Sequence, residues 1–269
     1  MTGSTETVYQ SDLTRPLMIA GNPENRLLVA DSWLVREGHV IAPELHQQRF
    51  FNSCHVRHGI EPTVLQPLWQ EALGLVPATG AWFPRMELAG NPQQPVFQCR
   101  IRPAPPIRDS VRLMLCSTGD IREAPRHKGP DIPLLSRFRQ QVLASGADEG
   151  VMTTSKGFLL EGLASSILWW ERHHGQDVLC TPPDSNRILP GTIRRLMLMI
   201  AEKENIPVAF RLVRPKQLDG CDVWAVNALH GIRPAVIWEK APFVPMADAL
   251  SSARLAWWRQ AIDRYAVRL

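Results

Sequence analysis

Lysine is scarce in this chain: only five of its 30 basic residues are lysine, and the rest are arginine. The arginines are scattered and form no basic block of the kind that binds nucleic acid or a membrane surface. The net charge of +4 still allows a groove that recognises anionic small molecules. We therefore expect a small-molecule partner, and neither nucleic acid nor a membrane.

Cysteine pairs and long apolar runs are also lacking. The five cysteines lie far apart with no CxxC spacing, so we interpret them as small buried apolar residues and expect no metal site. No apolar run approaches the roughly 18 residues that a membrane span requires. The N-terminal segment MTGSTETVYQSDLTRP is polar, with no apolar core of signal-peptide length. These features favour a cytoplasmic protein.

Short β-rich runs and helical patterns share the 269 residues, which predicts an α+β fold. Pro43 and Gly59 bracket one helix, and Lys156-Gly157 is typical of the turn in a hairpin over 151–162. Further helices are expected at 64–73, 134–145, 190–206 and 246–269, and strands at 26–35, 39–41, 82–88, 96–101, 111–116, 166–170, 178–180, 208–213, 222–227 and 234–238.

Residues 117–133 (STGDIREAPRHKGPDIP) combine proline, glycine and charges of both signs without an apolar period, which predicts a linker. Functional residues often lie in such loops. Lys128 is the one lysine there, between His127 and Gly129. A neutral lysine amine can form a Schiff base with a cofactor aldehyde. Taken alone, a loop lysine is more often a solvated surface group.

Two further segments carry candidate chemistry. ILPGTIRR (188–195) begins a helix, so the amides of Gly191, Thr192 and Ile193 can bind a phosphate, although any helix start offers such amides. GFLLEG (157–162) places Glu161 at the end of an apolar strand. That carboxylate is either an edge-strand group in water or the partner of the pyridine nitrogen of pyridoxal 5'-phosphate (PLP), whose protonation makes the ring an electron sink.

In combination these segments resemble the class IV aminotransferase (fold-type IV PLP) family, over roughly residues 27 to 240. That family includes branched-chain and D-amino acid aminotransferases and 4-amino-4-deoxychorismate lyase. The resemblance runs in order through LLVADSWLVREGHVIAPELHQQRF, RHKGPDI, GADEGVMTTSKGFLLEGLASSILWW, TPPDSNRILPGTIRR and VWAVNALHGIRP. GADEG, the Asn-Ala-Leu of 227–229 and the short N-terminal strand are most similar to the lyase.

The resemblance implies a role for each matching residue. Lys128 is the Schiff-base lysine, and Glu161 pairs with the pyridine nitrogen. Arg49 of LHQQRF matches the arginine that grips the cofactor phosphate, which a guanidinium does with two donors. The remaining cofactor-binding positions that the resemblance implies are Gly191, Thr192, Ile193, Asn227 and Ala228.

The resemblance also implies a small N-terminal α+β domain (1–120), a larger C-terminal domain (121–269) with the cofactor between them, and a homodimer. The expected function is transfer of an amino group between an amino acid and a 2-oxo acid. One alternative is the lyase reaction, which releases pyruvate and 4-aminobenzoate from aminodeoxychorismate. Another is PLP binding without turnover, because Asp131 and Ile132 stand where relatives carry asparagine and then tyrosine or arginine.

Overall fold

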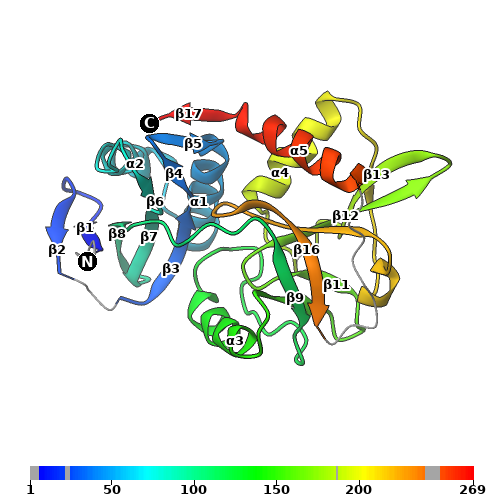
Figure 1. Cartoon of the computed structure of the whole chain (residues 1–269). Helices are drawn as coiled ribbons and strands as arrows, with labels where there is room; N and C mark the ends of the chain where they lie inside the picture. Colours follow the sequence, from blue (N-terminus) through cyan, green and yellow to red (C-terminus); the bar gives the residue numbers. More distant parts are fainter. Residues whose placement is uncertain (1–5, 22–24, 186, 240–248) are drawn as a thin grey trace. The chain divides into compact units, whose positions relative to one another are not determined.

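The computed structural model describes residues 6–21, 25–185, 187–239 and 249–269 (Figure 1). By internal contacts the chain divides into two compact units. Unit 1 comprises 1–107, 127–130 and 265–269, and unit 2 comprises 108–126 and 131–264. The predicted domains 1–120 and 121–269 stay a prediction.

Unit 1 contains an antiparallel sheet in the order β2-β1-β8-β7-β3. Its strands are β1 (Thr7–Ser11), β2 (Met18–Ala20), β3 (Leu27–Ser32), β7 (Arg85–Asn91) and β8 (Gln94–Ile101). A smaller sheet, β17-β5-β4-β6, is formed by β4 (Val35–Arg36), β5 (His39–Ile41), β6 (Ala81–Trp82) and β17 (Ala266–Arg268). Both sheets are built from neighbouring antiparallel strands, which short loops can connect.

Helix α1 (Pro43–His58) begins and ends where the sequence predicts. Proline occupies its first turn, and Gly59 ends it with a positive φ of 64°, a conformation that glycine adopts without steric cost. The helix lies against β3, next to α2 (Pro62–Gly74). Phe50 of α1 and Trp69 of α2 pack with ring centroids 5.5 Å apart, and Trp33 lies 5.1 Å from Trp69. This aromatic core holds α1 on the sheet.

Unit 2 contains a mixed sheet in the order β11-β10-β9-β16-β15-β12-β13-β14. Buried apolar side chains of its strands, among them Leu113, Val151 and Trp169, form the core. Its strands are β9 (Val111–Leu115), β10 (Glu149–Thr153), β11 (Leu159–Gly162), β12 (Ser166–His173), β13 (Gln176–Thr181), β14 (Val208–Phe210), β15 (Asp222–Asn227) and β16 (Gly231–Glu239). Its helices are α3 (Ile132–Ala144), α4 (Thr192–Lys203), the 3-10 helix η1 (Pro215–Leu218) and α5 (Ala249–Asp263).

The predicted α+β class and the hairpin over 151–162 are confirmed, but the C-terminal helix is too long in the prediction. Residues 246–248 lie outside the described part of the chain, and α5 ends at Asp263. The chain then forms β17, where Val267 pairs with Val40 of β5. Backbone pairing with a strand more than 200 residues earlier replaces the last helical turn, and no local pattern reports it. Strands β1 and β2 were not predicted either.

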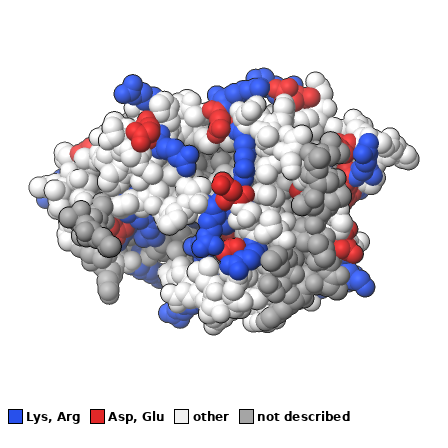
Figure 2. Space-filling view, in the orientation of Figure 1, with Lys and Arg blue, Asp and Glu red and all other residues white. Residues whose placement is uncertain are grey.

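Charged side chains of both signs lie beside one another on the face in Figure 2, and the basic ones do not gather into one patch. Within the described residues, no helix is long and apolar enough to cross a membrane. Among the same residues, no group of three or more His, Cys, Asp or Glu side chains could hold a metal ion.

Candidate functional site

Residues 127–130 of the long loop between β9 and α3 dock on unit 1. The Lys128 carbonyl accepts a hydrogen bond of 2.7 Å from the amide of Ala30 in β3. Gly129 has a φ of +141°, and a Cβ there would lie 2.7 Å from the Cα of Val29. Only glycine allows the loop to approach β3 this closely. The Lys128 backbone is therefore fixed against a strand of the sheet.

The Lys128 ammonium is desolvated at this position, and this lowers its pKa from the ordinary lysine value to about 8. The anionic Asp31 raises the pKa, while Arg49, Arg102 and Arg85 lower it further. At pH 7 roughly one molecule in ten then carries a neutral amine, against fewer than one in a thousand for a free lysine side chain. The Lys128 side chain is thus prepared to act as a nucleophile or a base.

Asp31 of β3 is the buried anion beside Lys128. Its side chain is fully buried and accepts hydrogen bonds of 2.8 Å from both Nε and Nη2 of Arg49. Nδ1 of His46, also buried, lies 2.7 Å from the same carboxylate. Charges and hydrogen bonds from these partners hold the pKa of Asp31 well below its usual range, although burial opposes this. The sequence-predicted phosphate arginine is thus oriented by a carboxylate that the sequence analysis did not identify.

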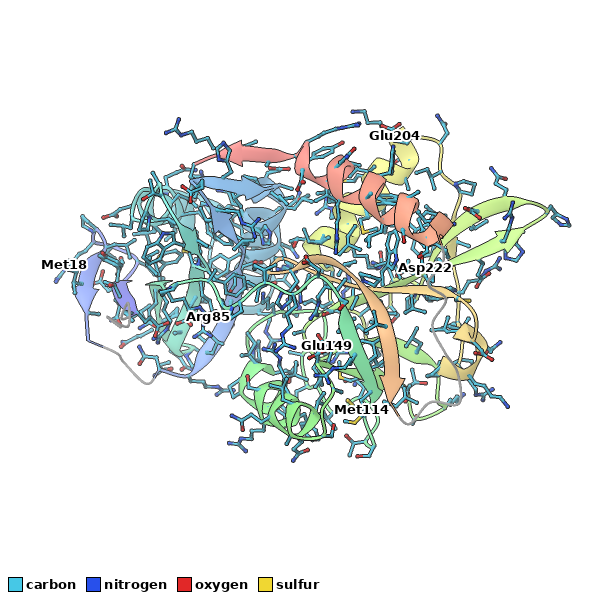
Figure 3. The ribbon with its side chains drawn as sticks, viewed as in Figure 1. Met18, Arg85, Met114, Glu149, Glu204 and Asp222 are labelled. Atoms are coloured by element: carbon cyan, nitrogen blue, oxygen red, sulfur yellow. The ribbon has the colours of Figure 1, made fainter. Side chains whose placement is uncertain are left out.

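Glu87 of β7 is a buried carboxylate, and the nearby arginines are Arg85 of β7, Arg100 of β8 and Arg102 just after β8. Arg85, which is labelled in Figure 3, and Arg100 both form ion pairs with Glu87. Arg102 donates from Nε to the Phe83 carbonyl at 3.0 Å and lies over the Phe83 ring. Arg100 is buried and paired rather than solvated. Arg85 and Arg102 of this group, together with Arg49 of α1, are the cations that act on Lys128.

Glu161 of β11, in unit 2, is buried rather than solvated at a sheet edge. Arg122 forms an ion pair with it and also binds Asp120, with Nε 2.9 Å from Oδ1. The amide of Leu189 donates to Glu161 at 2.9 Å. Burial raises the pKa of Glu161 to about 7, although Arg122 and the Leu189 amide both favour the ionised form. No sequence motif indicated this role for Arg122.

The predicted phosphate-binding helix start is also in unit 2. Gly191 is the N-cap residue of α4, and no side chain caps that end of the helix. A Cβ at Gly191 would lie 2.4 Å from Oγ of Ser166, so a larger residue there would displace that hydroxyl. Thr192 and Ile193 occupy the first turn with buried side chains. Uncapped first-turn amides with the positive end of the helix dipole favour an anion.

Asn227 is the last residue of β15 and Ala228 follows it, and Asn227 organises the turn into β16. Its Oδ1 accepts hydrogen bonds from the amides of Leu229 (3.1 Å) and His230 (2.8 Å). Its Nδ2 donates to the Ala164 carbonyl and to Oγ of Ser165, both at 3.2 Å. The turn is therefore tied to the β11–β12 connection.

Asp131, where relatives carry asparagine, is buried and accepts hydrogen bonds from the amides of Glu123 and Ala124, both at 2.9 Å. These bonds shape the loop that leads to Lys128. An aspartate at this position therefore has a structural use.

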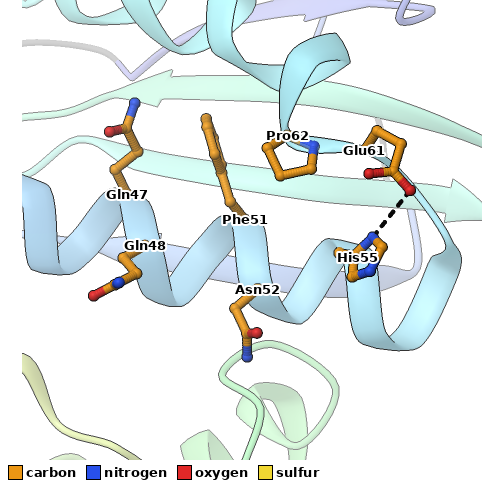
Figure 4. Close-up of a pocket in the computed structure, with 7 residues that line it drawn as sticks. All are labelled: Gln47, Gln48, Phe51, Asn52, His55, Glu61 and Pro62. Carbon is orange, nitrogen blue, oxygen red and sulfur yellow. Dashed lines mark ion pairs between the residues drawn. The ribbon is translucent and has the colours of Figure 1, made fainter.

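Of the predicted site residues, Lys128 and Arg49 lie in unit 1, and Glu161, Gly191, Thr192, Ile193, Asn227 and Ala228 lie in unit 2. In unit 1, the structure brings Lys128 and Arg49 together around Asp31. A separate pocket lies beside α1 (Figure 4). It is lined by Gln47, Gln48, Phe51, Asn52, His55, Glu61 and Pro62. None of these residues is a predicted site residue.

Residues 28–238 match the sequence model of the family described as amino-transferase class IV. A hypothetical aminotransferase from Mycobacterium tuberculosis has a similar structure. Its apo form is 19% identical, with 96% of this chain and 99% of that chain covered and a TM-score of 0.79. Its PLP-bound form is 18% identical, with 95% of this chain and 98% of that chain covered and a TM-score of 0.78.

Two further solved structures are similar. A branched-chain aminotransferase from Thermoproteus uzoniensis, with norvaline, is 16% identical over 97% of this chain and 98% of that chain, with a TM-score of 0.77. A candidate 4-amino-4-deoxychorismate lyase from Legionella pneumophila is 16% identical over 87% and 90%, with a TM-score of 0.67. At these identities the likeness shows the fold, and it confirms the predicted fold-type IV architecture. No curated protein matches the sequence.

Because its pKa is lowered, Lys128 of the PLP-free chain should react with an amine-labelling reagent at a lower pH than an ordinary lysine does. Only a neutral amine is acylated, so labelling of Lys128 should rise with pH and reach half its maximum at about pH 8. Mass spectrometry of the digested protein measures the labelled fraction of each lysine at each pH. Lys156, in the β10–β11 turn, is an exposed reference. A midpoint at about pH 10, as for a free lysine, would contradict the desolvated position.

Proposed function

Because this chain belongs to the class IV aminotransferase family, as its motifs predicted, we propose that it binds PLP covalently at Lys128 and moves an amino group between an amino acid and a 2-oxo acid. The observation that carries the proposal is the desolvated Lys128, whose pKa is lowered to about 8 and whose backbone is fixed on β3. A covalent cofactor lysine must present a neutral amine at physiological pH.

The residues present fit the chemistry of PLP. Arg49 offers a guanidinium already oriented by Asp31 through two hydrogen bonds of 2.8 Å. The uncapped start of α4 offers amides to a phosphate. Glu161 offers a buried carboxylate to a pyridine N–H. In this proposal, Asn227 and Ala228 bind beside the cofactor phosphate.

When bound, PLP supplies an electron sink for the substrate carbon that carries the amino group. The proposed task of Lys128 is to remove a proton from that carbon with Nζ and to return it at the cofactor carbon. Glu161 accepts from the protonated pyridine nitrogen, and the cationic Arg122 favours the ionised Glu161 carboxylate against the burial that raises its pKa. Arg49 and the α4 amides keep the phosphate in place while the substrate changes.

The lyase reaction is the second candidate, since the same base and the same electron sink can expel pyruvate from aminodeoxychorismate. Its support is the Asn-Ala-Leu segment of 227–229, together with the structural likeness to the candidate lyase. Binding without turnover is a third reading, motivated by Asp131 and Ile132. The hydrogen bonds that Asp131 accepts from loop amides weigh against this reading. They show that the aspartate stabilises the loop before Lys128, so it need not mark a lost activity.

The substitution Lys128→Ala tests the cofactor site. The wild-type protein with added PLP should be yellow, absorbing at about 410–420 nm, and borohydride should fix PLP to the chain. Lys128→Ala should lose both the absorbance and the fixed PLP, because no other amine takes the place of Nζ. Lys156→Ala, which changes an exposed turn lysine, is the matched control and should keep both. A colourless wild-type protein that ignores PLP would refute the proposal.

A two-substrate assay distinguishes the reactions. The first arm offers an amino donor with a 2-oxo acid, and the second offers aminodeoxychorismate alone. We expect amino-group exchange in the first arm and no aromatic product in the second. Release of pyruvate and 4-aminobenzoate without an acceptor would instead identify the lyase, and no turnover with a bound cofactor would identify a binding protein.

We also propose that the chain acts on a small amino-acid-like molecule in the cytoplasm and assembles as a homodimer. The family resemblance and the many tryptophans of the sequence support the dimer, because aromatic side chains are enriched at subunit interfaces. Light scattering at micromolar concentration should give the mass of two chains, and the mass of one chain would contradict the dimer.

A further inference from the structure

Asp31 is the carboxylate among the four charged groups of the described residues that act most strongly on Lys128. These groups are Asp31 from β3, Arg49 from α1, Arg85 from β7, and Arg102 directly after β8. Three of the four are cations. A lysine surrounded in this way would lose its proton far below the usual range if no anion balanced the arginines.

The geometry gives Asp31 a fixed orientation. Arg49 binds it through two parallel hydrogen bonds of 2.8 Å, which is the strongest arrangement for an arginine and a carboxylate. Its own chain neighbour contributes a third bond, from the Ser32 amide at 2.8 Å. A carboxylate that is fully buried and held by this many donors cannot rotate away from its neighbours.

His46 completes the arrangement from one helical turn before Arg49. Burial lowers the pKa of His46, so the ring is neutral near pH 7. An ionised carboxylate can only accept, and therefore Nδ1 of His46 carries the hydrogen of the 2.7 Å bond to Asp31. The histidine thus adds a hydrogen bond to Asp31 without adding a further positive charge beside Lys128.

The backbone places Lys128 next to this carboxylate. Ala30, which donates to the Lys128 carbonyl at 2.7 Å, directly precedes Asp31 in β3. The glycine after the lysine touches Val29 in the same strand. Any movement of Asp31 would therefore change the surroundings of both the Lys128 amine and the Arg49 guanidinium.

We propose that Asp31 is a positioning residue of the reaction, which orients Arg49 for the cofactor phosphate and, as the local anion, sets the proton affinity of Lys128. This inference rests on the proposed function, since it concerns the lysine and the arginine to which that function assigns the cofactor. Asp31 itself touches neither substrate nor cofactor in this scheme. It acts through its two neighbours.

The test is the amine-labelling titration of Lys128 in the PLP-free full-length chain, wild type against Asp31→Asn. Asparagine keeps the shape of the side chain and removes its charge, so the labelling midpoint should fall by about one pH unit or more. The matched control is Asp222→Asn. Asp222 is also buried and accepts from Trp224 at 2.7 Å and Arg254 at 3.1 Å, but it belongs to unit 2. The control should leave the midpoint unchanged.

If Asp31→Asn does not fold, the comparison moves to Arg49→Gln and the double variant Asp31→Asn/Arg49→Gln. The double variant leaves neither charge of the buried pair unpartnered, which is the usual cause of such failures. The midpoint should again be lower in the double variant than in Arg49→Gln alone. Equal midpoints in either comparison would overturn the role of Asp31.

PLP binding is measured separately, so the two proposals can fail independently. Borohydride fixation of PLP in the wild-type chain reports on the proposed function, whereas the labelling midpoint needs no cofactor. Wild-type fixation together with an unchanged Asp31→Asn midpoint would refute only the role of Asp31. A lowered midpoint in a chain that fixes no PLP would refute only the cofactor assignment. We further expect Asp31→Asn to weaken PLP binding about tenfold, because Arg49 loses its fixed orientation.

Discussion

The hydrogen bond between the Ala30 amide and the Lys128 carbonyl is the contact from which the chemistry of unit 1 follows. It brings a loop residue from between β9 and α3 onto a strand near the start of the chain, where the approach is close enough to require Gly129. Desolvation of the lysine amine follows from this position, and desolvation lowers the pKa of Lys128 to about 8. The loop thus gains the rigidity that a reacting amine requires.

Paired arginines and carboxylates recur in both units. Asp31 orients Arg49 in unit 1, and Arg122 holds Glu161 in unit 2. In each pair one member is a predicted cofactor ligand, and the other was not identified from the sequence. Buried charges are costly unless they are paired, so each pair lowers the cost of placing a charged cofactor ligand inside the protein.

Local sequence signals predicted local structure well. The ends of α1, at a proline and a glycine, and the Lys156-Gly157 turn between β10 and β11 are determined by residues close together in the sequence. The contacts of Asp31 are not, because its partners come from α1 and from the distant Lys128 loop, and a single acid within an apolar strand does not reveal them. Strand β17 was missed for the same reason, since its partner β5 lies at the other end of the chain.

The central claim is that one particular lysine carries the cofactor. It is tested most directly by adding PLP to the unmodified protein, reducing with borohydride, and mapping the modified peptide by mass spectrometry. We expect a pyridoxyl group on Lys128 alone, because its amine is desolvated and its backbone is fixed on β3. Modification of Lys156, Lys203, Lys216 or Lys240 instead, or of no lysine at all, would contradict it.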